Sequence, residues 1–203
     1  MKQFGATRGF SFEFFPPKTD AGRRRLSKTI HRLAPLNPSF VSVTFGAGGS
    51  TREGSFQTAS EIVRTTSLKV TPHLSCIGSE REQIAAQLET YRAIGVKRIV
   101  ALRGDVPADE PEPTRAFDYA SELVAFIKSF GGFEISVGCY PDFHPEAASP
   151  EADIQNFVRK VRAGANEAIT QYFYSNDAYF RFVEWSQRLG VDIPIVPGLM
   201  PLT

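Results

Sequence analysis

The chain has 203 residues, of which 42% are hydrophobic and 22% charged, the composition of a soluble globular protein with a sizeable core. Lys and Arg number 23 against 22 Asp and Glu, so no overall basic field favours nucleic acid, and a small-molecule partner is expected. No apolar run approaches the length of a membrane span, and the first residues lack the apolar segment of a signal peptide. We therefore expect no membrane association and a cytoplasmic location.

Short apolar segments recur along the chain in alternation with segments of helical periodicity. Seven strands are predicted to begin near Ser11, Phe40, Lys69, Arg98, Glu134, Ala168 and Pro194, and the first four starts are 29 residues apart. Helices are predicted between them, over 21–34, 51–65, 79–94, 115–130, 150–163 and 177–189. This is the rhythm of a repeated βα unit.

Signals at the predicted helix ends support these boundaries. Ser79 with Glu82 has the spacing of a capping box, and Ser149 precedes Pro150 at a first helical turn. Glycines stand where four of the helices should stop, at positions 95, 131, 164 and 190. Cys76 and Cys139 fall in separate strand patterns with no metal-ligand spacing, so we expect buried, reduced thiols and no metal site.

Strands that alternate with helices imply a parallel sheet, which leaves a doubly wound open sheet or a β/α barrel. The phase of the strands favours the barrel. Val41 and Val43 alternate with Ser42 and Thr44, for example, so one face is bulky and apolar while the other is small or polar. A central strand of an open sheet tends to be apolar on both faces. We predict a TIM-type (β/α)8 barrel, with about seven βα units in one domain over residues 1–203.

Polar side chains occur near the end of six successive predicted strands, where barrel enzymes place their chemistry. They are Glu13, Thr44, His73, Arg103 with Asp105, Tyr140 and Gln171. Glu13 alone, in FSFEFFPPK, would be read as a solvent-facing residue of an edge strand. Because six strands repeat the arrangement, a shared functional pocket is the better interpretation.

This set of residues indicates acid–base chemistry on a bound organic molecule. Among aromatic neighbours, Glu13 is expected to have a raised pKa and to donate a proton near neutral pH, whereas Asp105, close to Arg103, is expected to stay ionised. Two such carboxylates also fit a glycosidase, but the chain lacks a set of sugar-binding tryptophans. No serine or cysteine lies in a nucleophile elbow, and His73 with His144 lacks a third ligand for a metal site.

Two segments are candidates for a nucleotide-like ligand. The turn GAGGS at 46–50 allows close backbone approach but matches neither of the common glycine-rich phosphate motifs. Better candidates are His144 and four residues of one predicted helix, Asp153, Asn156, Arg159 and Lys160. The alternative for these four is an ordinary solvated helix face.

Seven motifs in order, FSFEFFPPK, FVSVTFGAGGS, TPHLSC, VALRGD, YPDFHPEA, AGANEAITQYFY and PIVPGLMP, resemble those of methylenetetrahydrofolate reductases of the bacterial, flavin-containing type. The resemblance covers essentially the whole chain. It implies a β/α barrel that holds FAD, takes hydride from NADH or NADPH, and reduces 5,10-methylenetetrahydrofolate to 5-methyltetrahydrofolate by a ping-pong scheme. It also implies a place in one-carbon metabolism and methionine biosynthesis.

The resemblance assigns roles to particular residues. Glu13 corresponds to the general acid that helps open the folate ring to an iminium ion, and Asp105 to an aspartate near both flavin and pterin. Thr44 and Gln171 match residues that contact the nicotinamide substrate or the folate. Contacts to FAD are implied for Phe45, Ala47, His73, Arg103, Gly104, Asp105, Tyr119, Ala120, Tyr140, His144, Ala147, Asp153, Asn156, Arg159 and Lys160.

The chain departs from the family pattern at its end, because it stops just beyond the seventh predicted strand where the family continues to an eighth. Without that strand a barrel has two exposed sheet edges, so we expect either a fragment of a longer protein or a chain that closes the gap through a partner. Two further readings stay open: a flavin-free, folate-using methyltransferase, and an inactive barrel fragment that serves as an interaction module. A homo-oligomer is compatible with the sequence.

Overall fold

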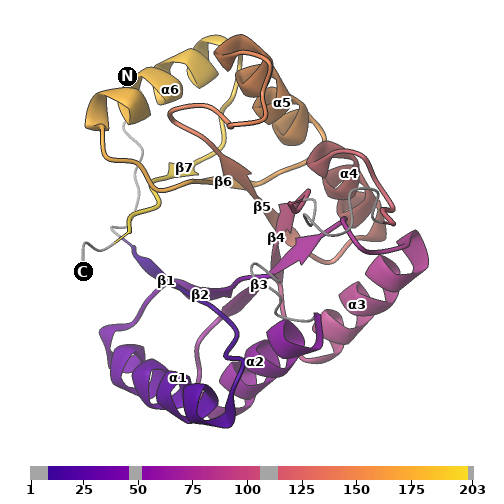
Figure 1. Ribbon diagram of the computed structural model, residues 1–203, viewed down its shortest axis with the longest axis vertical. Coiled ribbons are helices and arrows are strands. Elements are labelled where there is room, and N and C mark those ends of the chain that lie inside the picture. The colour runs from indigo at the N-terminus through magenta and orange to yellow at the C-terminus, as the bar shows by residue number, and fades with distance from the viewer. Residues whose placement is uncertain (1–8, 46–51, 106–113, 201–203) are drawn as a thin grey trace. The chain divides into compact units, whose positions relative to one another are not determined.

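The computed structural model describes residues 9–45, 52–105 and 114–200, in which strands and helices alternate along the chain (Figure 1). These residues group into two compact units. The first comprises the described residues of 1–73 and 87–98, and the second those of 74–86 and 99–203. The division runs through β3 (Val70–Ser75), α3 (Arg81–Ala93) and β4 (Arg98–Leu102).

The first unit contains β1 (Ser11–Phe14), α1 (Asp20–Leu33), the short 3-10 helix η1 (Ala34–Leu36), β2 (Phe40–Val43) and α2 (Arg52–Thr65). β1 pairs with β2, and β2 with β3, in parallel. In Figure 1, α1 and α2 lie along one side of these strands. Thr19 is the N-cap of α1, because its hydroxyl oxygen accepts the amide hydrogen of Gly22 at 3.0 Å.

The core of the first unit follows from the strand and helix periodicity. Val41 and Val43 of β2 are buried together with Ile30 of α1, Ile62 of α2 and Tyr91 of α3. Their burial removes large apolar surfaces from water, which is the main force that stabilises such a unit. The opposite phase of β2 and β3 is also buried but polar, at Ser42, Thr44, Thr71 and His73. The predicted alternation of apolar and polar phases is confirmed.

The second unit contains most of β4, then α4 (Ala120–Phe130), β5 (Glu134–Cys139), α5 (Pro150–Arg162), β6 (Glu167–Thr170), α6 (Asn176–Arg188) and β7 (Ile195–Val196). β5 pairs with β6, and β6 with β7, in parallel. α5 and α6 lie along one side of β6 and β7 (Figure 1), and the rings of Phe157 and Phe182 on these two helices are 5.3 Å apart. The fold of the described chain is therefore an α/β fold with parallel strands.

The predicted elements agree closely with the structure at most of their ends. Each of the seven strands begins within one residue of its predicted start. One helix differs clearly: α4 begins at Ala120, five residues later than predicted. The preceding segment pairs with the chain after β3 instead, because Arg115 bridges to Ile77 and Ser79, and Thr114 accepts the amide of Gly78.

The predicted capping box at Ser79 and Glu82 is wrong. α3 begins at Arg81, and the side chain of Gln83 accepts the amide hydrogen of Glu80 at 2.9 Å. The Ser79 hydroxyl is buried and has no hydrogen-bond partner among the described residues. Ser149 does cap α5, as predicted, since its hydroxyl accepts the amide hydrogen of Ala152.

None of the helices in the described ranges is both long enough and apolar enough to cross a lipid bilayer.

Candidate active site

In the first unit, Glu13 of β1 is contacted by two polar side chains, one from β2 and one from β3. Ser42 of β2 donates a hydrogen bond to Oε2 of Glu13 at 3.2 Å, and Nε2 of His73 in β3 lies 3.3 Å from the same oxygen. The Nε2 atom of His73 is within ion-pair distance of the carboxylate but is not aligned for a hydrogen bond. The imidazole is buried, whereas the carboxylate side chain is 47% exposed. Glu13 is thus a fixed, accessible carboxylate.

The predicted direction of the Glu13 pKa is wrong. The pKa is lowered from the ordinary value of 4.5, mainly because His73 interacts with the ionised carboxylate, with a smaller contribution from Ser42. Desolvation acts in the opposite direction but does not prevail. Aromatic residues that precede and follow an acid in sequence point to other faces of a strand, so they do not remove Glu13 from water.

Sheet register corrects the expected depth of the polar set. Glu13 is level with Ser42, not Thr44, and Ser42 is level with Thr71, so Thr44 and His73 lie two residues further along their strands. They remain on the same face, since side chains alternate with a period of two. The Thr44 hydroxyl is buried and has no hydrogen-bond partner within the described ranges. Such an atom calls for a partner outside the described residues, for example a bound water or ligand.

In the second unit, the segment after β5 folds back onto the start of α5. Asp153 accepts the amide hydrogen of His144 at 3.0 Å, and the rings of His144 and Tyr140 meet edge to face, 4.6 Å apart. The amides of Glu146 and Ala147 bond to Nδ1 and the carbonyl oxygen of His144. Four predicted site residues, Tyr140, His144, Ala147 and Asp153, are therefore brought together. Burial is the main reason that the pKa of Tyr140 is raised.

Lys160 shows that α5 is more than a solvated helix face. Its Nζ donates to the carbonyl oxygen of Gly138 in β5 at 2.5 Å, and burial lowers the pKa of its ammonium group. Arg159, one residue earlier, is exposed and donates to the carbonyl oxygen of Gln155. Asn156, one helical turn before Lys160, is partly exposed.

Arg103 is linked to the segment between β5 and α5 by an ion pair that the sequence did not suggest. Its guanidinium donates to the carboxylate of Glu146 at 2.6 Å, so Arg103 pairs with Glu146 and not with the nearby Asp105, which is exposed. This pairing lowers the pKa of Glu146. Gly104 has a φ of 90°, and a side chain there would meet the Ser75 hydroxyl, so the position requires glycine.

The remaining predicted residues have simpler surroundings. Tyr119 is 59% exposed and precedes Ala120, the first residue of α4; Glu122 accepts the amide hydrogen of Tyr119 at 3.2 Å. The amide of Gln171 donates to the carbonyl oxygen of Cys139, which places Gln171 level with Tyr140. Phe45 follows Thr44 and is partly exposed. Ala47 and the turn at 46–50 lie outside the described residues.

Both cysteines are free and buried, as predicted. Burial raises the pKa of Cys76 to about 11 and that of Cys139 to about 12, so neither thiol is ionised near neutral pH. In the described part of the chain, no three His, Cys, Asp or Glu side chains are grouped to hold a metal ion.

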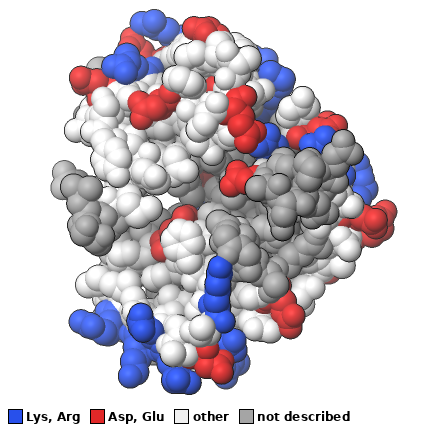
Figure 2. Space-filling view, in the orientation of Figure 1, with Lys and Arg blue, Asp and Glu red and all other residues white. Residues whose placement is uncertain are grey.

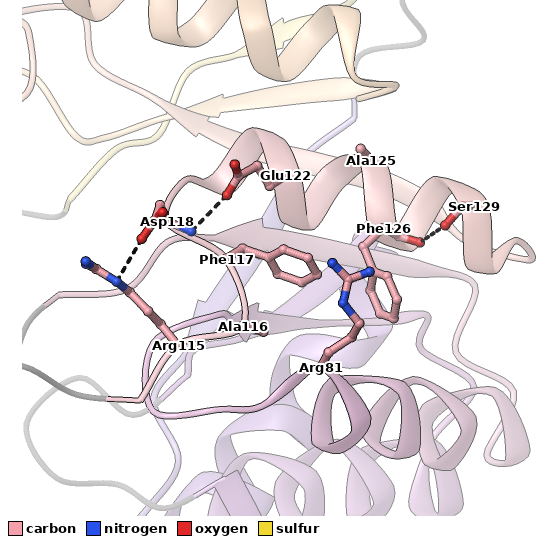
Figure 3. A pocket seen from close by; sticks show the side chains of 9 residues that line it. All are labelled: Arg81, Arg115, Ala116, Phe117, Asp118, Glu122, Ala125, Phe126 and Ser129. Carbon is pink, nitrogen blue, oxygen red and sulfur yellow. Dashed lines mark hydrogen bonds and ion pairs between the residues drawn. The ribbon is translucent and has the colours of Figure 1, made fainter.

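A cavity of about 540 Å³ lies elsewhere in the second unit, beside α4 (Figure 3). The guanidinium of Arg81 lies 4.8 Å from the ring of Phe117 and 5.2 Å from that of Phe126. Arg115 and Asp118, which also line the cavity, form an ion pair at 2.9 Å. None of the predicted site residues that the structure describes lines this cavity, although Asp118 immediately precedes Tyr119.

The fold is shared with solved structures of low sequence identity. One is an uncharacterised protein from Clostridium thermocellum, described as binding two copies of 5-methyl-5,6,7,8-tetrahydrofolic acid. It has a TM-score of 0.67 and 14% identity, over 96% of this chain and 67% of that one. Another is 3-dehydroquinate dehydratase from Geobacillus kaustophilus, with a TM-score of 0.63 and 12% identity. The match covers 98% of this chain and 76% of that one. At these identities the likeness establishes the class of fold alone.

The family is shown by sequence. The model of the methylenetetrahydrofolate reductase family matches residues 3–203, and the chain belongs to this family. It is 44% identical to 5,10-methylenetetrahydrofolate reductase of Pectobacterium carotovorum and 42% to that of Escherichia coli, over 95% of this chain and 64% of each relative. Methylenetetrahydrofolate reductase (NADH) 1 of Arabidopsis thaliana is 38% identical, over 96% of this chain and 35% of that relative. The chain thus spans about two thirds of the length of its bacterial relatives.

Proposed function

We propose that the protein reduces 5,10-methylenetetrahydrofolate to 5-methyltetrahydrofolate, with FAD as cofactor and NADH or NADPH as hydride source. Family membership supports the reaction, and the name of the Arabidopsis relative supports NADH as donor. The single structural observation that carries the proposal is the Glu13 carboxylate, fixed by Ser42 and beside His73 yet 47% exposed. A place in one-carbon metabolism and methionine biosynthesis, and a cytoplasmic location, belong to the same proposal.

The proposed chemistry needs a proton at the folate and a hydride at the carbon that becomes the methyl group. Opening the five-membered ring breaks a carbon–nitrogen bond, and the departing nitrogen takes a proton. Glu13 is ionised when exposed to water, so we propose that the bound folate displaces water and raises its pKa toward the range of a general acid. His73, whose Nε2 atom lies 3.3 Å from the carboxylate, helps to hold Glu13 in place for this step.

The side chains of the second unit fit a dinucleotide cofactor. A partly buried ammonium at Lys160, a guanidinium at Arg103 and an imidazole at His144 come from segments that hydrogen bonds tie together. Such a donor set complements the negative charge of a diphosphate. Bound FAD would supply the two-electron hydride chemistry, while these residues bind and orient it. Asp105 and Gln171 are proposed to contact the folate, and Thr44 the nicotinamide nucleotide.

We also propose that the βα units belong to a single barrel of the TIM type. The regular strand spacing, the polar phase of β2 and β3, and the likeness to solved structures support this proposal. A flavin-free methyltransferase would keep a folate site of this kind, but the grouping of cationic side chains around the β5–α5 segment favours the cofactor-binding alternative.

The visible spectrum of the purified protein tests the proposal. A protein that binds FAD, loses its visible absorbance with NADH or NADPH without oxygen, and recovers it with methylenetetrahydrofolate would support the reductase. A protein that neither contains FAD nor binds it when added would contradict the proposal. FAD that NADH bleaches but the folate does not reoxidise would favour a chain without reductase activity.

A further inference from the structure

The main chain at Arg103 is held against the end of β3. Its carbonyl oxygen accepts the hydroxyl hydrogen of Ser75 at 2.8 Å and the amide hydrogen of Ile77 at 3.1 Å. The thiol of Cys76 donates to the same oxygen at 3.2 Å. Because three donors from one segment meet at this carbonyl group, conformational freedom at Arg103 is confined to the side chain.

The side chain of Arg103 is held in turn by two acceptors. Nε donates to the carbonyl oxygen of Gly104 at 3.1 Å, and Nη2 donates to Oε2 of Glu146 at 2.6 Å. A guanidinium has five N–H groups, so the three that remain have no acceptor among the described residues. A guanidinium fixed in this way presents its free N–H groups in one plane, the arrangement that suits two-point binding of a phosphate.

Glu146 has anchors of its own, which do not involve Arg103. The amide of Glu146 donates to Nδ1 of His144 at 3.1 Å, and the amide of His144 donates to the Asp153 carboxylate at 3.0 Å. These bonds tie the turn that carries Glu146 to the first turn of α5. Both partners of the ion pair are therefore placed before they meet, which reduces the entropy lost when the pair forms.

Stability alone gives a weak reason for this ion pair. Acidic and basic side chains are interspersed around α5 and α6 in Figure 2, and exposed pairs of such groups contribute little to folding. The side chain of Glu146 is 57% exposed, whereas that of Arg103 is 30% exposed. The less exposed guanidinium is thus the group whose position the pair determines.

We propose that Glu146 is a positioning residue of the cofactor site, which orients the Arg103 guanidinium toward the diphosphate of FAD. The inference rests on the proposed function, in which Arg103 binds the cofactor. Glu146 then has two opposing effects on FAD. Its negative charge disfavours a diphosphate, whereas the oriented guanidinium loses less side-chain entropy when the diphosphate binds. We expect orientation to prevail.

Fluorescence titration of the full chain with FAD separates the two effects. Glu146→Ala should raise the dissociation constant by about tenfold, because the guanidinium loses its charged partner. Glu146→Gln keeps an acceptor for Nη2 and should stay within about threefold of the parent. Glu151→Ala removes an exposed acid at the start of α5, and this matched loss of charge should leave FAD binding unchanged or slightly tighter.

A double-mutant cycle tests whether Glu146 acts through Arg103. In the Arg103→Met background there is no guanidinium to orient, so Glu146→Ala should change the dissociation constant by less than about twofold. A merely structural role of Glu146 would give the same loss of affinity in both backgrounds. Unchanged thermal unfolding would show that the variants fold, and Glu146→Ser would replace Glu146→Ala if the latter does not.

Two results would overturn the inference alone. Glu146→Ala could bind FAD as tightly as the parent or more tightly, which would make Glu146 only a repulsive charge. The roughly tenfold loss could also persist in the Arg103→Met background, which would separate Glu146 from Arg103. A parent protein that binds no FAD would contradict the proposed function, and this inference with it.

Discussion

The Nε2 atom of His73 lies 3.3 Å from the Oε2 atom of Glu13, and this imidazole is the main reason that the Glu13 carboxyl has a lowered pKa. Glu13 lies on β1 and His73 on β3, so the contact links two strands of the first unit. The His73 side chain is buried, whereas that of Glu13 is about half exposed. The contact makes Glu13 a carboxylate in water near neutral pH. Any role for Glu13 as a proton donor therefore depends on what a bound molecule does to its surroundings.

The lowered pKa of Glu13 predicts a small acid-sensitive contribution to stability. Above the ordinary value of 4.5 the native state holds the ionised carboxylate and gains from His73 and Ser42; the gain is lost as pH falls through the lowered native pKa. Glu13 is about half exposed, so the contribution should not exceed about 1 kcal/mol. Urea unfolding at pH 7 and below pH 4.5 measures it. Glu13→Gln should lose less stability over this range than the parent, and an equal loss would show that the pair is not coupled to folding.

Lys160 should stabilise the second unit through its bond to Gly138. Lys160→Ala would leave the Gly138 carbonyl oxygen without this partner and remove a buried stem, so we expect a loss of about 1 to 3 kcal/mol in the free energy of unfolding. Arg159→Ala changes the exposed neighbour and should alter that free energy by less than about 0.5 kcal/mol. Equal effects of the two substitutions in urea titrations would mean that the Lys160 contact contributes nothing.

Gly104 should tolerate a side chain less well than Gly95. Both have positive φ, 90° and 85°, but a Cβ at Gly104 would approach the Ser75 hydroxyl to 2.1 Å, whereas Gly95 has open space. Gly95→Ala should cost about 1 kcal/mol from backbone strain, and Gly104→Ala more than that. Thermal unfolding of the two variants compares them directly. A smaller loss for Gly104→Ala would contradict the packing found around this turn.

The two thiols should be inert in the folded protein. With pKa values of about 11 and about 12, Cys76 and Cys139 present neither thiolate nor accessible sulfur to a disulfide reagent at pH 8. Both should react within minutes once the protein is unfolded in guanidinium. Rapid native-state labelling of either cysteine would show that its strand opens readily.

The strand starts were predictable because the 29-residue spacing and the alternation of Val with Ser or Thr are local patterns. The start of α4 was not, since residues 114–118 have helix-compatible composition but bond to the chain after β3. Long-range partners were also missed in the site. His73 reverses the expected pKa direction of Glu13, and Glu146, 43 residues from Arg103, takes the place of Asp105 beside it. Sequence neighbours give no information on such contacts.

Anaerobic half-reactions of Glu13→Gln test the central claim most directly. In the FAD-loaded protein, we expect reduction by NADH or NADPH to proceed at close to the parental rate, and reoxidation by methylenetetrahydrofolate to slow by about 10²- to 10⁴-fold, the contribution of a general acid. Stopped-flow absorbance of the flavin measures each half-reaction separately. Equal slowing of both, or folate reduction at the parental rate, would contradict the assignment of Glu13 as the proton donor.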